Sequence, residues 1–387
     1  MMAVPAIRKT LVPLLAALAV ALSAGSAAAL SGGDAARAAA LAAGYLIKSQ
    51  HDDGFFDYQF DFLRNRYSTK DNIVRQTGAG AVLAEYYLAT GDRRVAPALI
   101  AALEGFAAKS ILVGDGKVVA RGGTLRSARS GATALALLTE LRYFQATGDN
   151  RFAAIRHLWR DGLLAVRMPG GGFREYPGAD KELTFFNGEI WLALAEYHRM
   201  FPEDAAVAEV LPDLDKLFMA RYGAEEKSGF FLWGLQAAEV RHASGAGAAL
   251  HHYAVEKVRF YLDKRRPKFR ETAMHCASME GLMAVWTTLL ADDPANAAYG
   301  DLTERLGRRI KREMAKHVTF QIQPGQTRIA YDDGVYVHSD RLPEFAGAFL
   351  NGRYEIKARV DFTWHCLSSL VKYGLVVNAE GYRPRTD

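Results

Sequence analysis

Two stretches of the chain repeat a set of side chains suited to proton transfer or metal binding. Both stretches follow the order acid-x-x-x-His-Cys, with the members Glu271, His275, Cys276 and Asp361, His365, Cys366. A spacing of four residues puts each acid and its histidine on one face of a helix. If the two helices are neighbours, four polar groups converge, and an acid–histidine pair can orient a general acid or base.

The repeated pairs have other interpretations. Two histidines and two carboxylates could hold a divalent ion such as zinc, at Glu271, His275, Asp361 and His365. The pairs could also brace adjacent helices, and the two cysteines could form a disulfide or remain buried thiols. We expect no cofactor, and keep zinc as the weaker alternative.

A second polar group lies at the start of another predicted helix. Asp71 and Arg75 share one face of it, as do Asn72 and Gln76. This array suits a hydroxyl-rich or carboxylate-bearing ligand, because arginine binds a carboxylate with two hydrogen bonds. The alternative is that Asp71 caps the helix and forms an ion pair with Arg75.

Further candidates come from other segments. Glu189 follows Asn187 at a helix start, and a buried glutamate with a raised pKa could act as a general acid. Tyr331 and Asp333 belong to a long loop that could fold over a cleft, although Asp-Gly also signals a simple turn. Trp364 and several loop aromatics offer flat apolar rings that suit sugars, or that pack the loops onto the fold.

These candidates belong to a pattern that returns about six times after residue 30. An apolar helix-length segment is followed by a long loop, a second apolar helix and a short turn such as Ala-Thr-Gly-Asp at 89–92 and 146–149. Units of this size cannot bury their apolar faces alone, so they must stack or close into a ring. The predicted helices span 35–50, 71–89, 94–109, 126–145, 151–167, 185–200, 205–222, 232–240, 246–262, 271–291, 297–320 and 355–375.

The alternation of loop lengths predicts the architecture. Six hairpins closing on themselves make an all-α (α/α)6 toroid, here a single domain over residues 30–387. Long loops all connect an outer helix to an inner one, so they form a cleft at one end, beside the N-termini of the inner helices. Those N-termini present free N–H groups and a partial positive field, and loops on a rigid scaffold often carry function.

Residues 1–29 are expected to be a signal peptide. A basic pair, Arg8 and Lys9, precedes an apolar run at 11–22 and a small-residue stretch at 25–29. The run is too short for a convincing bilayer span, so we expect a periplasmic or secreted protein without a stable membrane span after cleavage. Two cysteines exclude a disulfide-dense scaffold.

The charge balance excludes a nucleic-acid-binding function. The chain has 48 Lys and Arg against 43 Asp and Glu, and shows no recognition motif. Two dense basic clusters, at 264–268 and 308–312, are expected to be solvated surface.

With these residues placed, the chain resembles the α/α toroid superfamily across about residues 34–375. That superfamily includes six-hairpin glycosidases, polysaccharide lyases and epimerases, and terpenoid cyclases and prenyltransferases. The stretch from Gln50 to Phe56 looks like the Gln-x-x-x-Gly-x-aromatic repeat of squalene-cyclase-like toroids, but occurs once, and a cyclase Asp-x-Asp-Asp motif is absent. Asp361, His365 and Cys276 echo the zinc set of prenyltransferases, although the expected export argues against prenyl diphosphate chemistry. The Asn-Asn-His-Ser-Tyr pattern of alginate-lyase-like toroids is missing.

The functional prediction is an exported enzyme that hydrolyses a glycosidic bond in an envelope or extracellular polysaccharide. Asp361 and Glu189 would be the two carboxyl groups, with Asp71 as a substitute and His365 and Arg75 positioning the substrate. Alternatively, a uronate lyase or epimerase would use His365 or His275 as base and Tyr331 as acid. A third possibility is a non-catalytic glycan- or peptide-binding envelope protein.

Overall fold

The computed structural model describes residues 30–223, 225, 230–272, 274–291 and 299–377. The predicted signal peptide therefore lies outside the described residues. Within them, no helix is both long and apolar enough to cross a membrane.

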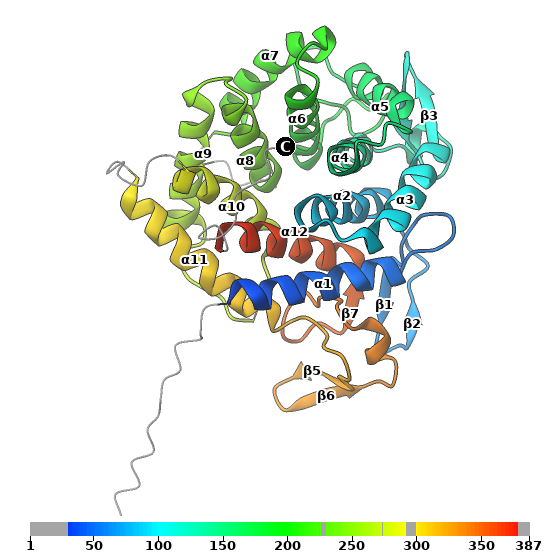
Figure 1. The fold of residues 1–387 in the computed structure, drawn as a ribbon, viewed down its shortest axis with the longest axis vertical. Coiled ribbons are helices and arrows are strands. Elements are labelled where there is room, and N and C mark those ends of the chain that lie inside the picture. The colour runs from blue at the N-terminus through cyan, green and yellow to red at the C-terminus, as the bar shows by residue number, and fades with distance from the viewer. Residues whose placement is uncertain (1–29, 224, 226–229, 273, 292–298, 378–387) are drawn as a thin grey trace, which may run out of the picture.

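Twelve α-helices form two concentric layers in the described part of the chain (Figure 1). The inner layer consists of α2 (Ile73–Thr90), α4 (Ser130–Thr147), α6 (Thr184–Met200), α8 (Phe230–Ala243), α10 (Cys276–Ala291) and α12 (Val360–Val377). The outer layer consists of α1 (Gly32–Lys48), α3 (Ala96–Ala108), α5 (Ala153–Ala165), α7 (Ala205–Arg221), α9 (Ala248–Phe260) and α11 (Gly300–Val318). Each inner helix packs against the next, and α12 packs against α2, so the ring is closed. The predicted (α/α)6 toroid is confirmed.

The burial pattern separates the two layers. In inner helix α4, every residue from Ser130 to Tyr143 is buried, because the helix is enclosed by its ring neighbours and by the outer layer. Outer helix α11 instead buries one apolar stripe that includes Leu306, Ile310 and Met314, and its other faces carry charges. Helix α1 buries a row of alanines, which lets it lie close against α12.

The short turns repeat one another in structure as well as in sequence. Gly91 and Gly148 end α2 and α4 with φ of 66° and 70°, a left-handed conformation that glycine adopts without steric cost. After each glycine, an aspartate accepts a hydrogen bond from a tyrosine hydroxyl of the preceding helix, Tyr86 to Asp92 at 3.1 Å and Tyr143 to Asp149 at 2.9 Å. These turns hold each inner helix against the start of the next outer one.

The long loops contain short antiparallel strands, which the prediction of an all-α fold did not include. The strands are β1 (Gln59–Asp61), β2 (Arg66–Tyr67), β3 (Ser110–Val113), β4 (Gly116–Val119), β5 (Arg328–Asp332), β6 (Val335–His338) and β7 (Lys357–Arg359). β1 pairs with both β2 and β7, which joins the first long loop to the last, while β3–β4 and β5–β6 are hairpins. Short 3-10 turns are η1 (Arg93–Val95), directly before α3, η2 (Leu125–Ser127), before α4, and η4 (Leu342–Phe345), in the last long loop. The π-helical turn η3 (Tyr261–Arg265) continues α9.

The Gln50–Phe56 stretch proves to be a structural brace. The Gln50 side-chain amide donates to the carbonyls of Gly54, at 3.0 Å, and of Ala98 on α3, at 2.9 Å. Gly54 has φ of 81°, and a Cβ there would lie 2.1 Å from the carbonyl oxygen of Ala101. The motif therefore fixes the first loop against the outer layer.

Candidate active site

A cavity of about 690 Å³ lies at the end of the toroid where the inner helices begin. The N-terminal turns of α2, α6, α8, α10 and α12 line it, together with the cap residue of α4 and the loop before η2. The predicted cleft is thus present, and seven of the predicted site residues line it: Asp71, Asn72, Arg75, Glu189, Asp361, Trp364 and His365.

Glu189 is the most unusual side chain of this cavity. It lies on α6 and is buried, and among the described residues its Oε2 has no hydrogen-bond partner. Burial raises the pKa of this carboxyl well above its ordinary value, because the charged form loses its hydration. A neutral carboxyl group at the wall of a cavity is a proton donor.

A glycine on the facing helix makes room for Glu189. A Cβ at Gly131 of α4 would lie 2.0 Å from the Glu189 Oε2 and 2.4 Å from the ring of Phe186. We therefore expect Gly131→Ala to displace the carboxyl and to lower kcat at least tenfold, even though alanine favours the helix by about 1 kcal/mol. Steady-state kinetics of both proteins on a substrate that the wild type turns over measure this effect.

The matched control is Gly44→Ala on α1, where an added Cβ meets nothing within 4 Å. This variant should keep full activity and gain about 0.5–1 kcal/mol of stability in urea unfolding. Wild-type kcat in Gly131→Ala would show that the position of Glu189 does not matter.

Asp361 is held by two arginines instead of by His365. Arg359 donates to both carboxylate oxygens, at 2.5 and 2.9 Å, and Arg75 of α2 approaches Oδ2 at 3.0 Å. Arg75 also donates to the hydroxyl of Tyr58. Asp361 is therefore a charged, hydrogen-bonded carboxylate, in contrast to the isolated Glu189.

His365 is paired with a residue that the sequence reasoning missed. Its Nδ1 donates to Glu280 of α10 at 2.6 Å, since an ionised carboxylate only accepts. The ring lies against Trp364, with centroids 3.7 Å apart. Glu280 is buried in an otherwise apolar helix, and such an isolated acid was a usable signal, because it is costly without a partner.

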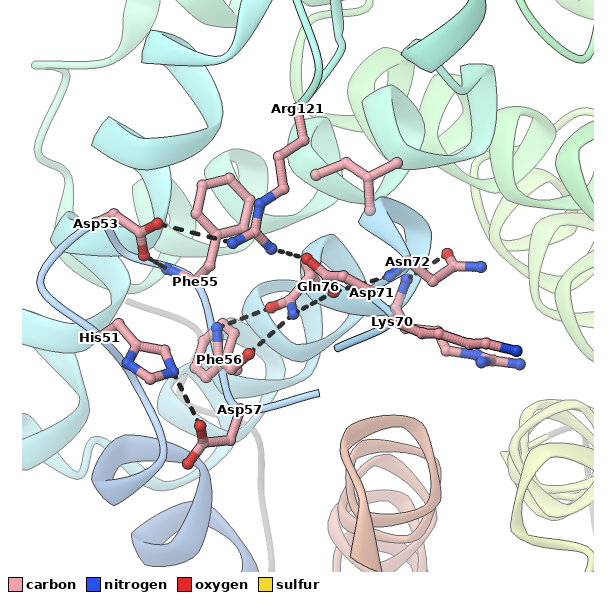
Figure 2. Close-up of polar contacts among 12 residues, drawn as sticks. His51, Asp53, Phe55, Phe56, Asp57, Lys70, Asp71, Asn72, Gln76 and Arg121 are labelled. Atoms are coloured by element: carbon pink, nitrogen blue, oxygen red, sulfur yellow. Dashed lines mark hydrogen bonds and ion pairs between the residues drawn. The ribbon is translucent and has the colours of Figure 1, made fainter. Parts of the chain in front are cut away.

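Asp71 forms part of a network that supports the mouth of the cavity (Figure 2). Arg121 donates to Asp71, lies 3.7 Å from Asp53 and covers the ring of Phe55 at 4.3 Å. Gln76 donates to Asp71 at 2.7 Å. The predicted Asp71–Arg75 pair is replaced by an Asp71–Arg121 pair because Arg75 binds Asp361.

Three predicted ligand contacts at helix starts act as structural supports. Asn72 caps α2 by accepting from the N–H groups of Val74 and Arg75. Gln76 is buried, and its side-chain amide accepts from the Phe56 N–H at 2.7 Å and donates to the Phe56 carbonyl at 2.9 Å. Asn187 is buried and binds the Phe173 N–H and the Tyr222 hydroxyl, so it holds the loop before α6. Of the three, only Asn72 lines the cavity.

The predicted helical pair Glu271–His275 is wrong. Helix α10 begins at Cys276, because the N–H groups of Met274 and His275 bond to the Asn351 carbonyl and the His317 ring and not within a helix. Glu271 is exposed, 3.6 Å from Arg312 of α11. Burial lowers the pKa of His275 to about 4, and neither residue lines the cavity.

The four residues considered for zinc do not come together. Asp361 binds arginines, His365 binds Glu280, and Glu271 and His275 lie toward α11. Across the described ranges, no three His, Cys, Asp or Glu side chains are grouped as metal ligands.

Tyr331 and Asp333 lie on the β5–β6 hairpin, which projects from the outer edge of the ring (Figure 1). Tyr331 is exposed, and Asp333 accepts from Tyr354 and lies 3.5 Å from Arg353. The Asp-Gly pair forms the hairpin turn, with Gly334 at φ of 73°. The hairpin does not line the central cavity.

The two cysteines form a disulfide that joins α10 to α12. His365, which directly precedes Cys366 on α12, forms its hydrogen bond with Glu280 of α10, so the disulfide and this hydrogen bond connect the same two helices. The alternative of free buried thiols is therefore wrong for this structure.

Further residues complete the lining of the cavity. Arg129 directly precedes α4, its guanidinium lies 3.8 Å from the Glu175 carboxylate, and it covers the ring of Tyr176 at 5.5 Å. Phe185 is half-exposed at the cavity wall, and the ring centroids of Trp233 and Trp364 are 6.2 Å apart. Charged and aromatic groups therefore line the cavity together.

Comparison with known proteins decides the fold class. The GH76A α-1,6-mannanase from Salegentibacter sp. HEL1_6 superposes with a TM-score of 0.66, at 10% identity, over 89% of this chain and 100% of that one. This chain has the six-hairpin glycosidase fold. No protein-family model and no curated protein matches the sequence.

Other six-hairpin structures are similar to it over comparable lengths. An unsaturated glucuronyl hydrolase specific for heparin gives a TM-score of 0.60 at 10% identity, over 88% of this chain and 97% of that one. A sugar epimerase from a ruminal bacterium gives 0.58 at 12% identity, over 91% and 99%. At these identities the similarity establishes the shared six-hairpin architecture, and function has to be argued from the site.

Proposed function

We propose that this protein is a carbohydrate-active enzyme that hydrolyses a glycosidic bond in the central cavity. The observation that carries the proposal is Glu189, a buried carboxyl with a raised pKa and an unpartnered oxygen at the cavity wall. Such a group supplies the proton that a leaving sugar oxygen needs.

The second carboxyl group is Asp361. Glycosidases place one neutral and one charged carboxyl around the scissile bond, and the environments of Glu189 and Asp361 differ in this way. In the proposed reaction Glu189 protonates the glycosidic oxygen, the bond to the anomeric carbon breaks, and the Asp361 carboxylate stabilises the positive charge that develops there. Water completes the hydrolysis, and the proton it releases restores Glu189.

The cavity chemistry and the comparisons support an oligo- or polysaccharide as the proposed substrate. The mannanase was solved with α-1,6-mannotetrose and α-1,6-mannotriose, and the glucuronyl hydrolase is described as specific for heparin. Arg75, Arg121 and Arg129 line the cavity here, while Phe185 and Trp233 offer apolar rings. Both neutral and acidic glycans are therefore suitable substrates to test.

The proposal includes export to the periplasm or the medium. The signal-like residues 1–29 suggest it, and the Cys276–Cys366 disulfide is compatible with an oxidising compartment.

The experiment is product analysis by mass spectrometry after incubation with α-1,6-mannan, oligogalacturonate and heparin oligosaccharides. Hydrolysis adds one water per cleaved bond, elimination gives one product with a mass deficit of one water, and epimerisation leaves the mass unchanged but alters the chromatographic retention. Glu189→Gln should form products at least about a hundredfold more slowly, and Glu209→Gln, at an exposed site on α7, should behave as wild type. Binding without any product from the wild type would replace the proposal with a glycan-binding role.

A specific observation favours epimerisation or elimination as the second candidate. Glu280 holds His365 by Nδ1, which leaves Nε2 for proton abstraction, and Arg75 beside it could neutralise a uronate carboxylate.

The Glu280–His365 pair separates the two chemistries. If His365 is the base, we expect Glu280→Gln to lower kcat at least tenfold and to shift the acidic limb of the pH–rate profile, because the imidazolium loses its counter-ion. If hydrolysis through Glu189 is the reaction, the same variant should change kcat less than tenfold without moving that limb. A kcat–pH series on both proteins distinguishes the outcomes.

A further inference from the structure

A second cavity, larger than the central one, lies at the outer layer of the ring. A groove of about 1600 Å³ follows outer helix α11 and is bordered by the segment after η3 and by the β5–β6 hairpin (Figure 1). None of its lining residues lines the central cavity. The basic cluster at 308–312, expected to be plain solvated surface, forms part of its wall.

The groove carries a net positive charge. Eight of its lining residues are lysine or arginine, and a single one, Glu271, is acidic. Six of the eight cations form ion pairs, mostly with acids outside the lining, as Arg308 does with Glu304. Lys311 and Arg328 are exposed and form no ion pair with a described residue, so the groove keeps positive charge that attracts anions.

Two of the guanidinium groups lie over aromatic rings. Arg312 lies 4.0 Å from the ring of Phe269, and Arg328 lies 4.6 Å from the ring of Tyr336. A stacked guanidinium loses little freedom on binding and keeps its N–H edges available to carboxylate or sulfate groups. The groove is too large for one small anion and matches an extended chain.

We propose that this groove binds a strand of an anionic polysaccharide, one that carries carboxylate or sulfate groups, at a site separate from the central cavity. The positive charge and the stacked arginines define an anionic occupant, and the choice of a polysaccharide rests on the proposed function. Nucleic acid is less suited, because guanidinium groups cover the faces of Phe269 and Tyr336 on which bases would stack.

The test measures fluorescence anisotropy of end-labelled oligogalacturonate with the full chain carrying Glu189→Gln, which prevents cleavage of the probe. On that background, Lys311→Glu with Arg328→Glu reverses two unpaired charges without leaving an acid unpartnered. We expect the Kd to rise about tenfold or more and the salt dependence of binding to weaken. Arg93→Glu with Lys216→Glu makes the same charge change at exposed sites on η1 and α7 and should leave the Kd within about twofold, since neither residue lines the groove.

Two other outcomes overturn the groove assignment, and a third separates it from the proposed hydrolase. Absence of binding, or equal losses in both double variants, removes the groove as a site. Tighter binding of single-stranded DNA with the same dependence on Lys311 and Arg328 assigns the groove to nucleic acid instead. Groove-dependent binding of oligogalacturonate together with an absence of glycan cleavage by the wild type would refute the proposed hydrolase while leaving the groove assignment intact.

Discussion

Glu189→Gln is expected to lower kcat by about 10²–10⁴ while leaving glycan binding nearly unchanged, because the amide keeps the shape of the side chain but cannot donate the proton. The measurement is kcat and KM on the glycan that the wild type cleaves, with Glu209→Gln as the exposed control. A variant that retains more than a tenth of wild-type kcat would exclude Glu189 as the general acid.

The same substitution should make the protein more stable at neutral and mildly alkaline pH. Because burial raises the pKa of Glu189, the folded state binds this proton at pH values where the unfolded chain has released it. The stability therefore falls as the pH rises through the folded-state pKa, and glutamine removes that fall. Activity should decline over the same pH range, since the acid must be protonated to act.

Urea unfolding of wild type and Glu189→Gln across this pH range tests the linkage. A gain of stability in the variant that grows with pH, beside a loss of turnover, identifies a site kept for function at a cost in stability. A variant that is less stable than wild type at every pH would indicate that Glu189 serves the fold.

Loss of the disulfide has the second large expected effect. The bond closes a sequence separation of 90 residues between the first turn of α10 and α12, adjacent members of the inner ring. In the chain-entropy account, opening a loop of this size destabilises the fold by about 4.6 kcal/mol. Cys276→Ala with Cys366→Ala should show this loss in urea unfolding.

The double variant also tests the site beside it. The hydrogen bond between His365 and Glu280 connects the same two helices as the disulfide. Without the disulfide, we therefore expect the imidazole of His365 to be positioned less rigidly. Treatment with a reductant should lower the stability of the wild type and leave the double variant unchanged. Equal stability of the oxidised and reduced wild type would contradict the prediction.

The architecture followed from the sequence because it depends on local patterns. Apolar spacing marked the helices, the two Thr-Gly-Asp turns marked the short connections, and the alternation of loop lengths placed the cavity beside the inner N-termini. The residues at those N-termini, among them Asp71, Arg75, Glu189, Asp361 and His365, could be singled out for this reason alone.

The pairing of side chains within the cavity depended on contacts between segments that are far apart in the sequence. Local sequence patterns do not reveal such contacts. Asp361 and His365 share a helix face, yet Asp361 binds Arg75 from α2, and His365 binds Glu280 from α10, 85 residues away. Helix α10 begins at residue 276 and not at the predicted residue 271, because the N–H groups of Met274 and His275 donate to Asn351 and His317.

The amino-acid sequence by itself thus determined the helical hairpins, the ring and the end of the ring that carries the cavity, since these arise from periodicity and turn chemistry. Only the tertiary structure decided which carboxyl is isolated and neutral, which is charged and paired, and that the basic face of α11 borders a groove. Burial and pairing are properties of side chains from different helices brought together by ring closure, so they appear only once the ring is formed.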